Sequence, residues 1–245
     1  MSRQRLDKLL AHMGIGTRSE LKKIVKQGRV QVNGLIVKDV GLQVTPDIDR
    51  IEYDGETIVY KEFIYLMLNK PQGVISATED GRERTVLDIL DESFRIFDIF
   101  PVGRLDKDTE GLLLLTNDGQ LAHNLLSPRK HVPKTYFAHV EGAVCEADQV
   151  HFSKGVELDD GYVTLPAQLV IKQVDDESSP PISKIELTIH EGKFHQVKRM
   201  FQAVGKQVVY LKRMQMGSLL LDPLLTLGEY RELSEEELTG LRDRI

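Results

Sequence analysis

The chain has 245 residues, of which 41% are hydrophobic and 29% are charged, a balance that excludes an intrinsically disordered protein. Every apolar run is shorter than the roughly 18 residues of a membrane span, and the N-terminus has no continuous apolar segment of the signal-peptide type. Cys145 is the only cysteine, which excludes an internal disulfide and makes the cytoplasm the expected compartment.

The charge is distributed unevenly along the chain. The whole chain carries −6, but residues 1–48 hold nine Lys and Arg against four Asp and Glu, a net charge of +5 that leaves −11 for the remainder. This asymmetry indicates a basic nucleic-acid-binding module joined to a more acidic body. Chance variation on a small solvated domain is the alternative reading.

Two helices and a hairpin are predicted for the N-terminal segment. Apolar residues recur at helical spacing over residues 3–13, and a second helix is predicted to begin at a capping box, residues 17–20. Asn33-Gly34 then supplies a hairpin turn. We expect this module to occupy residues 1–58, with a linker near 56–63.

The body, residues 62–245, is predicted to contain more strands than helices. Strands are expected at 64–68, 99–102, 112–115, 136–140, 184–189, 208–212 and 219–221. Helices are expected up to Leu126 after the turn at 117–119, at 194–204 and at 234–244, and DDESSPP at 175–181 is expected to be a loop. Strands and helices do not alternate regularly, so the predicted fold class is α+β, with a mixed, mainly antiparallel sheet flanked by helices.

The most informative stretch is GRLDKDTEG at residues 103–111, followed by LLLLTNDG. A strand is predicted to deliver a glycine, then Arg104 and Asp106, then a polar turn, before four leucines return to the core. This arrangement would hold one carboxylate at the lip of a rigid scaffold, where a catalytic group is best positioned.

Three other readings of this stretch stay open at the level of residue pattern. DKDTEG matches the start of a calcium loop, but Asn117 stands at position 12, where that loop has Glu. Asp106 and Glu110 would be the carboxylate pair of a glycoside hydrolase if the right gap separated them. Charged residues also simply decorate many turns.

Two resemblances to known families favour one of these interpretations, that of a catalytic carboxylate. RLDKLLAHMGIGTRSELKKIVKQGRVQVNG, from Arg5 onward, resembles an S4 RNA-binding domain. The motif G-R-L-D-x-D-T-x-G-L-L-L-L-T-N-D-G resembles the signature of the pseudouridine synthases of the RsuA-like family. Further family segments occur in the family's order: N-K-P-x-G at 69–73 precedes this signature, and K-T-Y at 134–136 and EGKFHQVKRM at 191–200 follow it.

The resemblance implies an enzyme that isomerises a uridine within RNA and uses neither a cofactor nor a metal. Asp106 stands at the position of the catalytic aspartate, and it either attacks C1′ or takes the C2′ proton. Tyr136 is expected to stack on the flipped uracil and to assist at C5. Lys198 is expected to orient Asp106, although many relatives carry Arg at this position, so Arg199 is a second candidate for this contact.

The expected partner is ribosomal RNA. Lys before Arg in HQVKRM resembles the small-subunit enzymes, so 16S RNA in a partly assembled small subunit is the expected substrate, bound by a monomer. A 23S site and a non-catalytic ribosome-binding or assembly factor are the alternatives. RNA contacts are expected in the body from Arg104, Arg129, Lys130, Lys134, Lys193, His195, Arg199, Lys206, Lys212 and Arg213, and in the S4 module from Arg3, Arg5, Lys8, Arg18, Ser19, Lys22 and Lys23.

Overall fold

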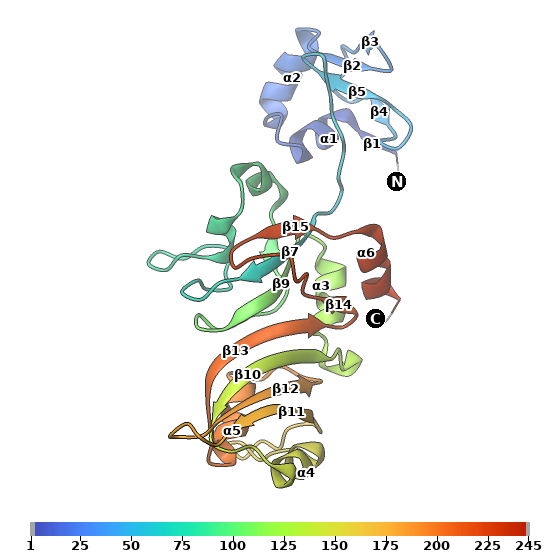
Figure 1. Ribbon diagram of the computed structural model, residues 1–245. Helices are drawn as coiled ribbons and strands as arrows, with labels where there is room; N and C mark the ends of the chain where they lie inside the picture. The colour runs from blue at the N-terminus through green and yellow to red at the C-terminus, as the bar shows by residue number, and fades with distance from the viewer. Residues whose placement is uncertain (1–2, 244–245) are drawn as a thin grey trace. The chain divides into compact units, whose positions relative to one another are not determined.

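The computed structural model describes residues 3–243 (Figure 1). The chain forms two compact units. The first ends at Ile64 and also includes Asp91–Asp98, and the second contains Tyr65–Leu90 and the chain from Ile99 onward. The domain limits of 1–58 and 62–245 stay predictions. Within residues 3–243, no helix has both the length and the apolar character that crossing a membrane requires.

In the first unit, two helices pack against short strands around an aliphatic core. The helices are α1 Leu6–His12 and α2 Arg18–Lys26. The strands are β1 Gln4–Arg5, paired with β4 Gln43–Val44, and a sheet in the order β3 Leu35–Ile36, β2 Val30–Val32, β5 Ile51–Tyr53 and β6 Glu56–Thr57. The core is formed mainly by Leu6, Leu9, Leu10, Leu21, Ile24, Val25, Val30 and Ile51.

Two local sequence signals in this unit, a capping box and a hairpin turn, predicted the structure correctly. The capping box is confirmed, because the Thr17 N–H donates to Glu20 Oε2 at 2.8 Å and the Glu20 N–H donates back to Thr17 Oγ1 at 3.4 Å. Asn33 and Gly34 have φ of 54° and 78°, as a two-residue hairpin turn requires.

Two predicted limits in this unit were wrong. Residues 4–5 do not belong to the first helix: they pair with β4, and the extended Arg5 backbone (φ −72°, ψ 140°) precedes a helix that begins at Leu6. The linker also starts later than residue 56, because Glu56–Thr57 pair with β5. In both places strand pairing, which a local pattern does not encode, sets the limit.

The second unit is built on one mixed sheet, to which nine strands within the described residues contribute. Its order is β11-β12-β10-β13-β9-β7-β15, with β14 paired to β13 and β8 paired to β9 (Figure 1). The bounds are β7 Tyr65–Lys70, β8 Phe100–Pro101, β9 Glu110–Thr116, β10 Lys134–Glu141, β11 Gln168–Asp175, β12 Ile182–Ile189, β13 Gln207–Met216, β14 Leu219–Leu220 and β15 Tyr230–Glu232. Every pair in this order is antiparallel except β9 with β13, so the predicted fold class is confirmed.

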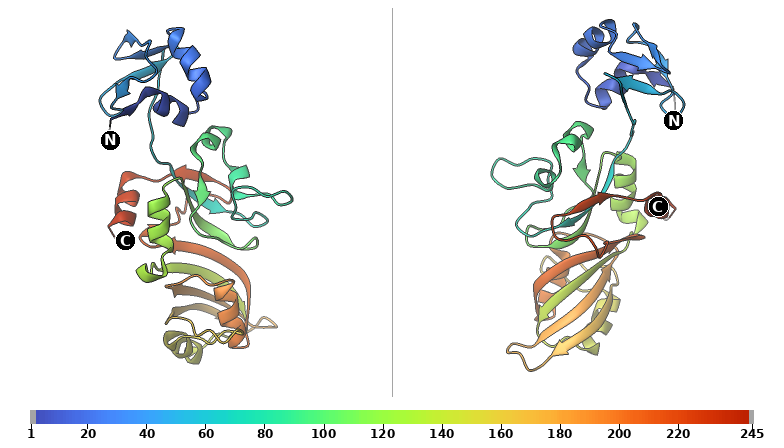
Figure 2. Two further views of the ribbon diagram at one scale, coloured as in Figure 1. Left: turned by 180° about the vertical axis from the view of Figure 1, so that it is seen from behind. Right: turned by 45° about the horizontal axis from the view of Figure 1, so that its top comes forward.

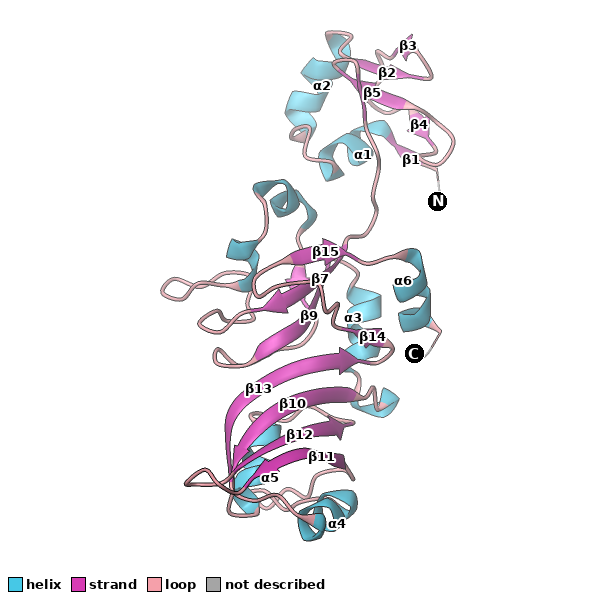
Figure 3. Ribbon diagram, in the orientation of Figure 1, coloured by secondary structure: helices cyan, strands magenta, loops and turns pink. Residues whose placement is uncertain are grey.

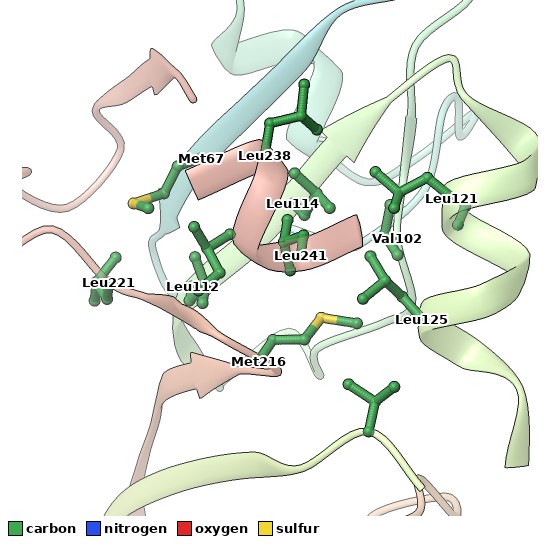
Figure 4. Packing of buried hydrophobic residues seen from close by; sticks show 13 residues of the cluster. Met67, Val102, Leu112, Leu114, Leu121, Leu125, Met216, Leu221, Leu238 and Leu241 are labelled. Carbon is green, nitrogen blue, oxygen red and sulfur yellow. The ribbon is translucent and has the colours of Figure 1, made fainter. Parts of the chain in front are cut away.

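Helices cover part of this sheet. They are α3 Gly119–Leu126, α4 Glu146–Lys154, α5 Gln196–Ala203 and α6 Glu235–Arg242, with 3₁₀ turns η1 Val86–Ile89 and η3 Pro128–Lys130; a third turn, η2 Glu92–Phe97, lies in the first unit. α5 contacts β13 and α4 contacts β11, and α5 is seen in front of the strands in the left view of Figure 2. Figure 3 distinguishes the helices from the strands. Leu114 of β9, Leu125 of α3 and Leu241 of α6 belong to one apolar core of this unit (Figure 4).

Gly111 makes the parallel junction of β9 with β13 possible. Its φ is +102°, and a Cβ at this position would lie 2.3 Å from the Arg213 carbonyl oxygen, so only glycine fits. β13 also pairs with β10, on which Tyr136 lies. The junction therefore brings the loop that precedes β9 next to the strand that carries Tyr136.

Candidate active site

A pocket in the second unit gathers polar residues from three of the sequence motifs. It is lined by Arg104 and Asp106 from the loop at 102–109, Tyr136 from β10, and His195 and Lys198 at the start of α5. The sheet order thus joins segments that lie far apart in the chain.

Asp106 is carried by a loop and not by the end of a strand. The strand before it, β8, ends at Pro101, and the next strand begins at Glu110, so the predicted strand-end geometry was wrong. Leu105 is buried between Arg104 and Asp106, which both line the pocket. Arg104 and Asp106 therefore meet at the pocket through a loop, and not through the pairing of a strand.

Two buried side chains hold the Asp106 loop through its carbonyl groups. Lys70, at the end of β7, is fully buried and its Nζ donates to the carbonyl oxygens of Asp106 at 3.0 Å, Thr109 at 2.9 Å and Pro71 at 3.0 Å. Ser76 Oγ donates to the Leu105 carbonyl at 2.9 Å and accepts from the Leu105 N–H at 3.0 Å. Burial lowers the pKa of Lys70 to about 8.

Lys198 contacts both acidic side chains of the loop. Its Nζ lies 3.2 Å from Asp106 Oδ2 and 2.6 Å from Asp108 Oδ1. Burial alone would lower the pKa of Lys198, but the hydrogen bonds and charges of the two carboxylates outweigh it and raise the pKa. Burial alone would raise the pKa of Asp108, and Lys198 reverses that effect, so the pKa of Asp108 is lowered. His195 Nε2 lies 3.5 Å from the other oxygen, Asp106 Oδ1.

These contacts argue against a calcium site and against a glycoside hydrolase pair of carboxylates. The Lys198 ammonium occupies the space between the Asp106 and Asp108 carboxylates that a calcium ion would need. Glu110 does not line the pocket; it is buried and accepts a hydrogen bond of 2.7 Å from the Tyr210 hydroxyl. Asp106 and Glu110 therefore do not face one substrate as a glycosidase pair would.

The loop before α5 is clamped by a buried carboxylate. Glu191 accepts hydrogen bonds from the Tyr162 hydroxyl at 2.7 Å, the Leu165 N–H at 2.9 Å and Gln196 Nε2 at 2.9 Å. His195, the residue before α5, has a left-handed backbone with φ of 48°. Such a conformation is unfavourable for a residue other than glycine and is found most often where surrounding contacts enforce it.

Arg199 is directed away from Asp106. It forms ion pairs with Asp159 and Asp160, and it is absent from the residues that line the pocket. Successive residues of a helix are rotated by about 100°, so Lys198 and Arg199 cannot share one direction. Lys198 is the residue of this pair that contacts the carboxylate.

Several other predicted RNA-binding residues are exposed. Lys193 is exposed at the pocket, with its Nζ 4.2 Å from the centre of the Tyr162 ring, and Arg129 is exposed on η3 away from the pocket. In the first unit Lys8, Arg18, Lys22 and Lys23 are exposed, as are Arg3 and Ser19. Arg5 is paired with Asp7 at 2.7 Å, which partly neutralises it.

Comparison with known proteins identifies the family. The family model described as RNA pseudouridylate synthase matches residues 64–203, and the S4 domain matches residues 4–47. This chain belongs to the RNA pseudouridylate synthase family. The RsuA-like resemblance and the S4 module are therefore confirmed, and this synthase is an RNA-binding enzyme that converts uridine to pseudouridine.

Its relatives resemble the synthase over nearly the full length. An uncharacterized RNA pseudouridine synthase of Bacillus subtilis is 56% identical and covers 98% of both chains. Ribosomal large subunit pseudouridine synthase B of B. subtilis is 41% identical over 98% of this chain and 96% of the relative. Ribosomal small subunit pseudouridine synthase A of Salmonella typhimurium is also 41% identical, over 97% and 99%. Overall identity therefore does not discriminate between the two ribosomal subunits.

A solved structure shows the same fold. The crystal structure of a pseudouridylate synthase, 38% identical, superposes with a TM-score of 0.66 and covers 97% of this chain and 99% of the other. The arrangement of the strands around the pocket thus follows the fold of the family.

Two of the expected phosphate contacts were wrong, because the side chains are buried. Lys134 is 8% exposed and its Nζ donates to the Val132 carbonyl at 2.8 Å, while Arg213 is 2% exposed and its Nε donates to the Leu112 carbonyl at 2.7 Å. Neither side chain is free to reach a phosphate. On β10, Lys134 and Tyr136 share the buried face of the strand, a placement that basic character alone does not reveal.

The residue pattern did not predict the supporting side chains. Lys70 lies in the N-K-P-x-G segment but had no predicted role, and Ser76, Glu191 and Gln196 were likewise unassigned. Their contacts are made to backbone atoms or to one another across the fold. A lysine at the end of an apolar strand, as in LMLNK, was the sequence signal for the buried Lys70.

Lys134→Met is expected to change how stability depends on pH. Burial, with the nearby charge of Arg213 adding to it, lowers the pKa of Lys134 from 10.5 to about 8. Its protonation therefore costs folding free energy below pH 8, and this cost falls as pH rises from about 8 toward 10.5. From pH 7 to pH 9.5, the free energy of unfolding of the wild type should increase by about 1–2 kcal/mol relative to that of the variant. Urea unfolding at both pH values measures this difference, and the exposed Lys154→Met variant is the control; a constant difference would contradict the prediction.

Proposed function

We propose that this synthase isomerises one uridine of 16S ribosomal RNA, with Asp106 as the catalytic carboxylate. The observation that supports the catalytic role is the position of Asp106: its carboxylate is in the pocket with Tyr136, held by Lys198 and partly exposed. The target uridine leaves its stack to enter this pocket, at a cost on the order of a few kcal/mol.

Isomerisation breaks the N1–C1′ bond, turns the uracil and joins C5 to C1′, so nothing is added or removed. Asp106 starts this sequence by attack at C1′ or by removal of the C2′ proton, and both routes require an ionised carboxylate beside the ribose. Lys198 contacts Oδ2 and, unlike Arg, does not form a two-pronged contact, so it leaves Oδ1 directed toward His195 and the pocket. Tyr136 stacks on the uracil and assists with the C5 proton.

The choice of 16S RNA depends on the motif around Lys198. HQVKRM places Lys before Arg, as in the small-subunit enzymes that the chain resembles, and Lys198 is the residue that reaches Asp106. The alternative is a uridine of 23S RNA, which the 41% identity to a large-subunit synthase of B. subtilis supports. We place the enzyme in the cytoplasm, acting as a monomer on a partly assembled small subunit.

Mapping of pseudouridine identifies the target. Ribosomal RNA is isolated from cells with and without the gene for this protein, and pseudouridines are mapped chemically in both ribosomal RNAs. We expect one site to disappear from 16S RNA and to return when the purified enzyme is added to that RNA. Loss of a 23S site would establish the alternative and overturn the 16S assignment.

The exposed cations of the S4 domain are expected to bind phosphates. Replacing Lys8, Arg18, Lys22 and Lys23 together by Gln should weaken RNA binding and flatten its salt dependence by about 0.7–0.9 in log–log slope for each phosphate that the variant no longer binds. Filter binding of ribosomal RNA fragments at salt concentrations between about 50 and 200 mM measures both effects. Lys154→Gln, an exposed substitution on α4, should leave the slope unchanged. An unchanged slope in the fourfold variant would refute this role.

A further inference from the structure

Phe194 is an exposed aromatic side chain beside the candidate active site. It lies between Lys193 and His195, both of which line the pocket, and it is 75% exposed. Neither the isomerisation step nor the packing of the core uses this ring. A single exposed apolar side chain is common on protein surfaces, so it is the position of Phe194 at the pocket, and not its exposure alone, that suggests a binding role.

The loop that carries Phe194 is anchored on both sides. Before it, Glu191 accepts three hydrogen bonds; after it, Gln196 Oε1 accepts from the Lys193 N–H at 2.9 Å while its Nε2 donates to Glu191. The left-handed His195 then begins α5. Exposure of Phe194 is therefore a consequence of a well-anchored loop and not of a loose chain.

One face of the Phe194 ring already stacks on His195, which also lies close to Asp106. The rings of Phe194 and His195 stack with centroids 3.8 Å apart and an interplanar angle of 19°, and His195 Nε2 lies 3.5 Å from Asp106 Oδ1. Since Phe194 is largely exposed, its second face is free to accept another flat ring. Asp106, His195 and Phe194 thus follow one another outward from the pocket, and a base on the free face of Phe194 would continue this series.

We propose that Phe194 is a stacking platform for the nucleobase next to the flipped uridine. This inference depends on the proposed function, because it places the reacting uridine in the pocket at Asp106. When that uridine leaves its helix, the neighbouring base loses a stacking partner, and the free face of Phe194 replaces it. Aromatic rings bind unstacked bases in this way without reading their hydrogen-bonding edges. In this proposal Lys193, which is exposed one residue earlier, binds the adjoining phosphate.

Stacking is tested with RNA stem-loops that contain the mapped uridine. In one set, the 5′ or the 3′ neighbour is replaced by an abasic nucleotide; in another, by the fluorescent base 2-aminopurine. We expect Phe194→Ala to raise KM about tenfold with kcat within about twofold of wild type. An abasic nucleotide at the correct neighbour should raise the wild-type KM by the same factor and add nothing in the variant.

The fluorescence measurement separates this inference from the catalytic assignment. Wild type and Asp106→Asn should both quench 2-aminopurine at that neighbour on binding, and Phe194→Ala and Phe194→Leu should not, because Leu restores apolar surface without a flat ring. Leu224→Ala, which removes another exposed apolar side chain, should behave as wild type. An equal KM in wild type and Phe194→Ala, additive effects of variant and abasic RNA, or quenching that survives in both Phe194 variants would each overturn the proposal. Turnover by Asp106→Asn would instead refute the proposed function alone.

Discussion

Asp106→Asn is expected to lower pseudouridine formation by more than about 1,000-fold while leaving the fold intact. The amide has nearly the shape of the carboxylate but carries no charge, so it neither attacks C1′ nor removes a proton, and each of these roles contributes a large part of a catalysed rate. The measurement is the rate of pseudouridine formation in transcribed ribosomal RNA at saturating enzyme. Binding of the RNA should change by less than the rate.

Asp108→Asn is the matched control for this experiment. Asp108 also contacts Lys198, but its side chain is 67% exposed and it does not line the pocket. We expect its variant to retain activity within about tenfold, because Lys198 keeps its contact with Asp106. Should Asp106→Asn still form pseudouridine at a rate near that of Asp108→Asn, the mechanism would be wrong.

Lys70→Met is expected to lower both activity and stability. The variant fits the space approximately but leaves the carbonyls of Pro71, Asp106 and Thr109 without the donor they share, at a position where Lys70 is fully buried. Loss of this buried hydrogen-bond donor should lower the free energy of unfolding by about 2 kcal/mol. This figure is a net value, because the variant also no longer has to bury a charge. A shift of the Asp106 loop by about 1 Å would reduce kcat about 100-fold.

Lys107→Met is the control for Lys70→Met. It tests whether the loss of any lysine near Asp106 lowers activity and stability, or only the loss of the buried one. Lys107 lies in the same loop, is 51% exposed and forms an ion pair with Glu83 at 2.6 Å. Its loss should change the free energy of unfolding by less than about 1 kcal/mol. Urea unfolding and single-turnover rates measure both variants. Equal losses in the two would show that the buried hydrogen bonds do not position the loop.

Local sequence patterns were sufficient where short-range contacts decide the structure. The capping box at residues 17–20, a second cap at Ser234 and the Asn33-Gly34 turn all involve atoms a few residues apart. Strand β11 and helix α4 were missed: β11 is mostly solvent-exposed, and α4 buries only two residues, so neither has a clear periodic apolar face.

Motif order along the chain was enough to identify the family and to propose Asp106 as the catalytic carboxylate. Which side chains surround that carboxylate depended on the tertiary structure, because the parallel junction of β9 with β13 and the rotation of α5 are set by contacts between distant segments. Lys198 rather than Arg199 reaches Asp106 since Asp159 and Asp160 bind the arginine. In the same way, only packing could show that Lys134 and Arg213 are buried while Phe194 is exposed: the charge of a residue is local, but access to solvent belongs to the whole fold.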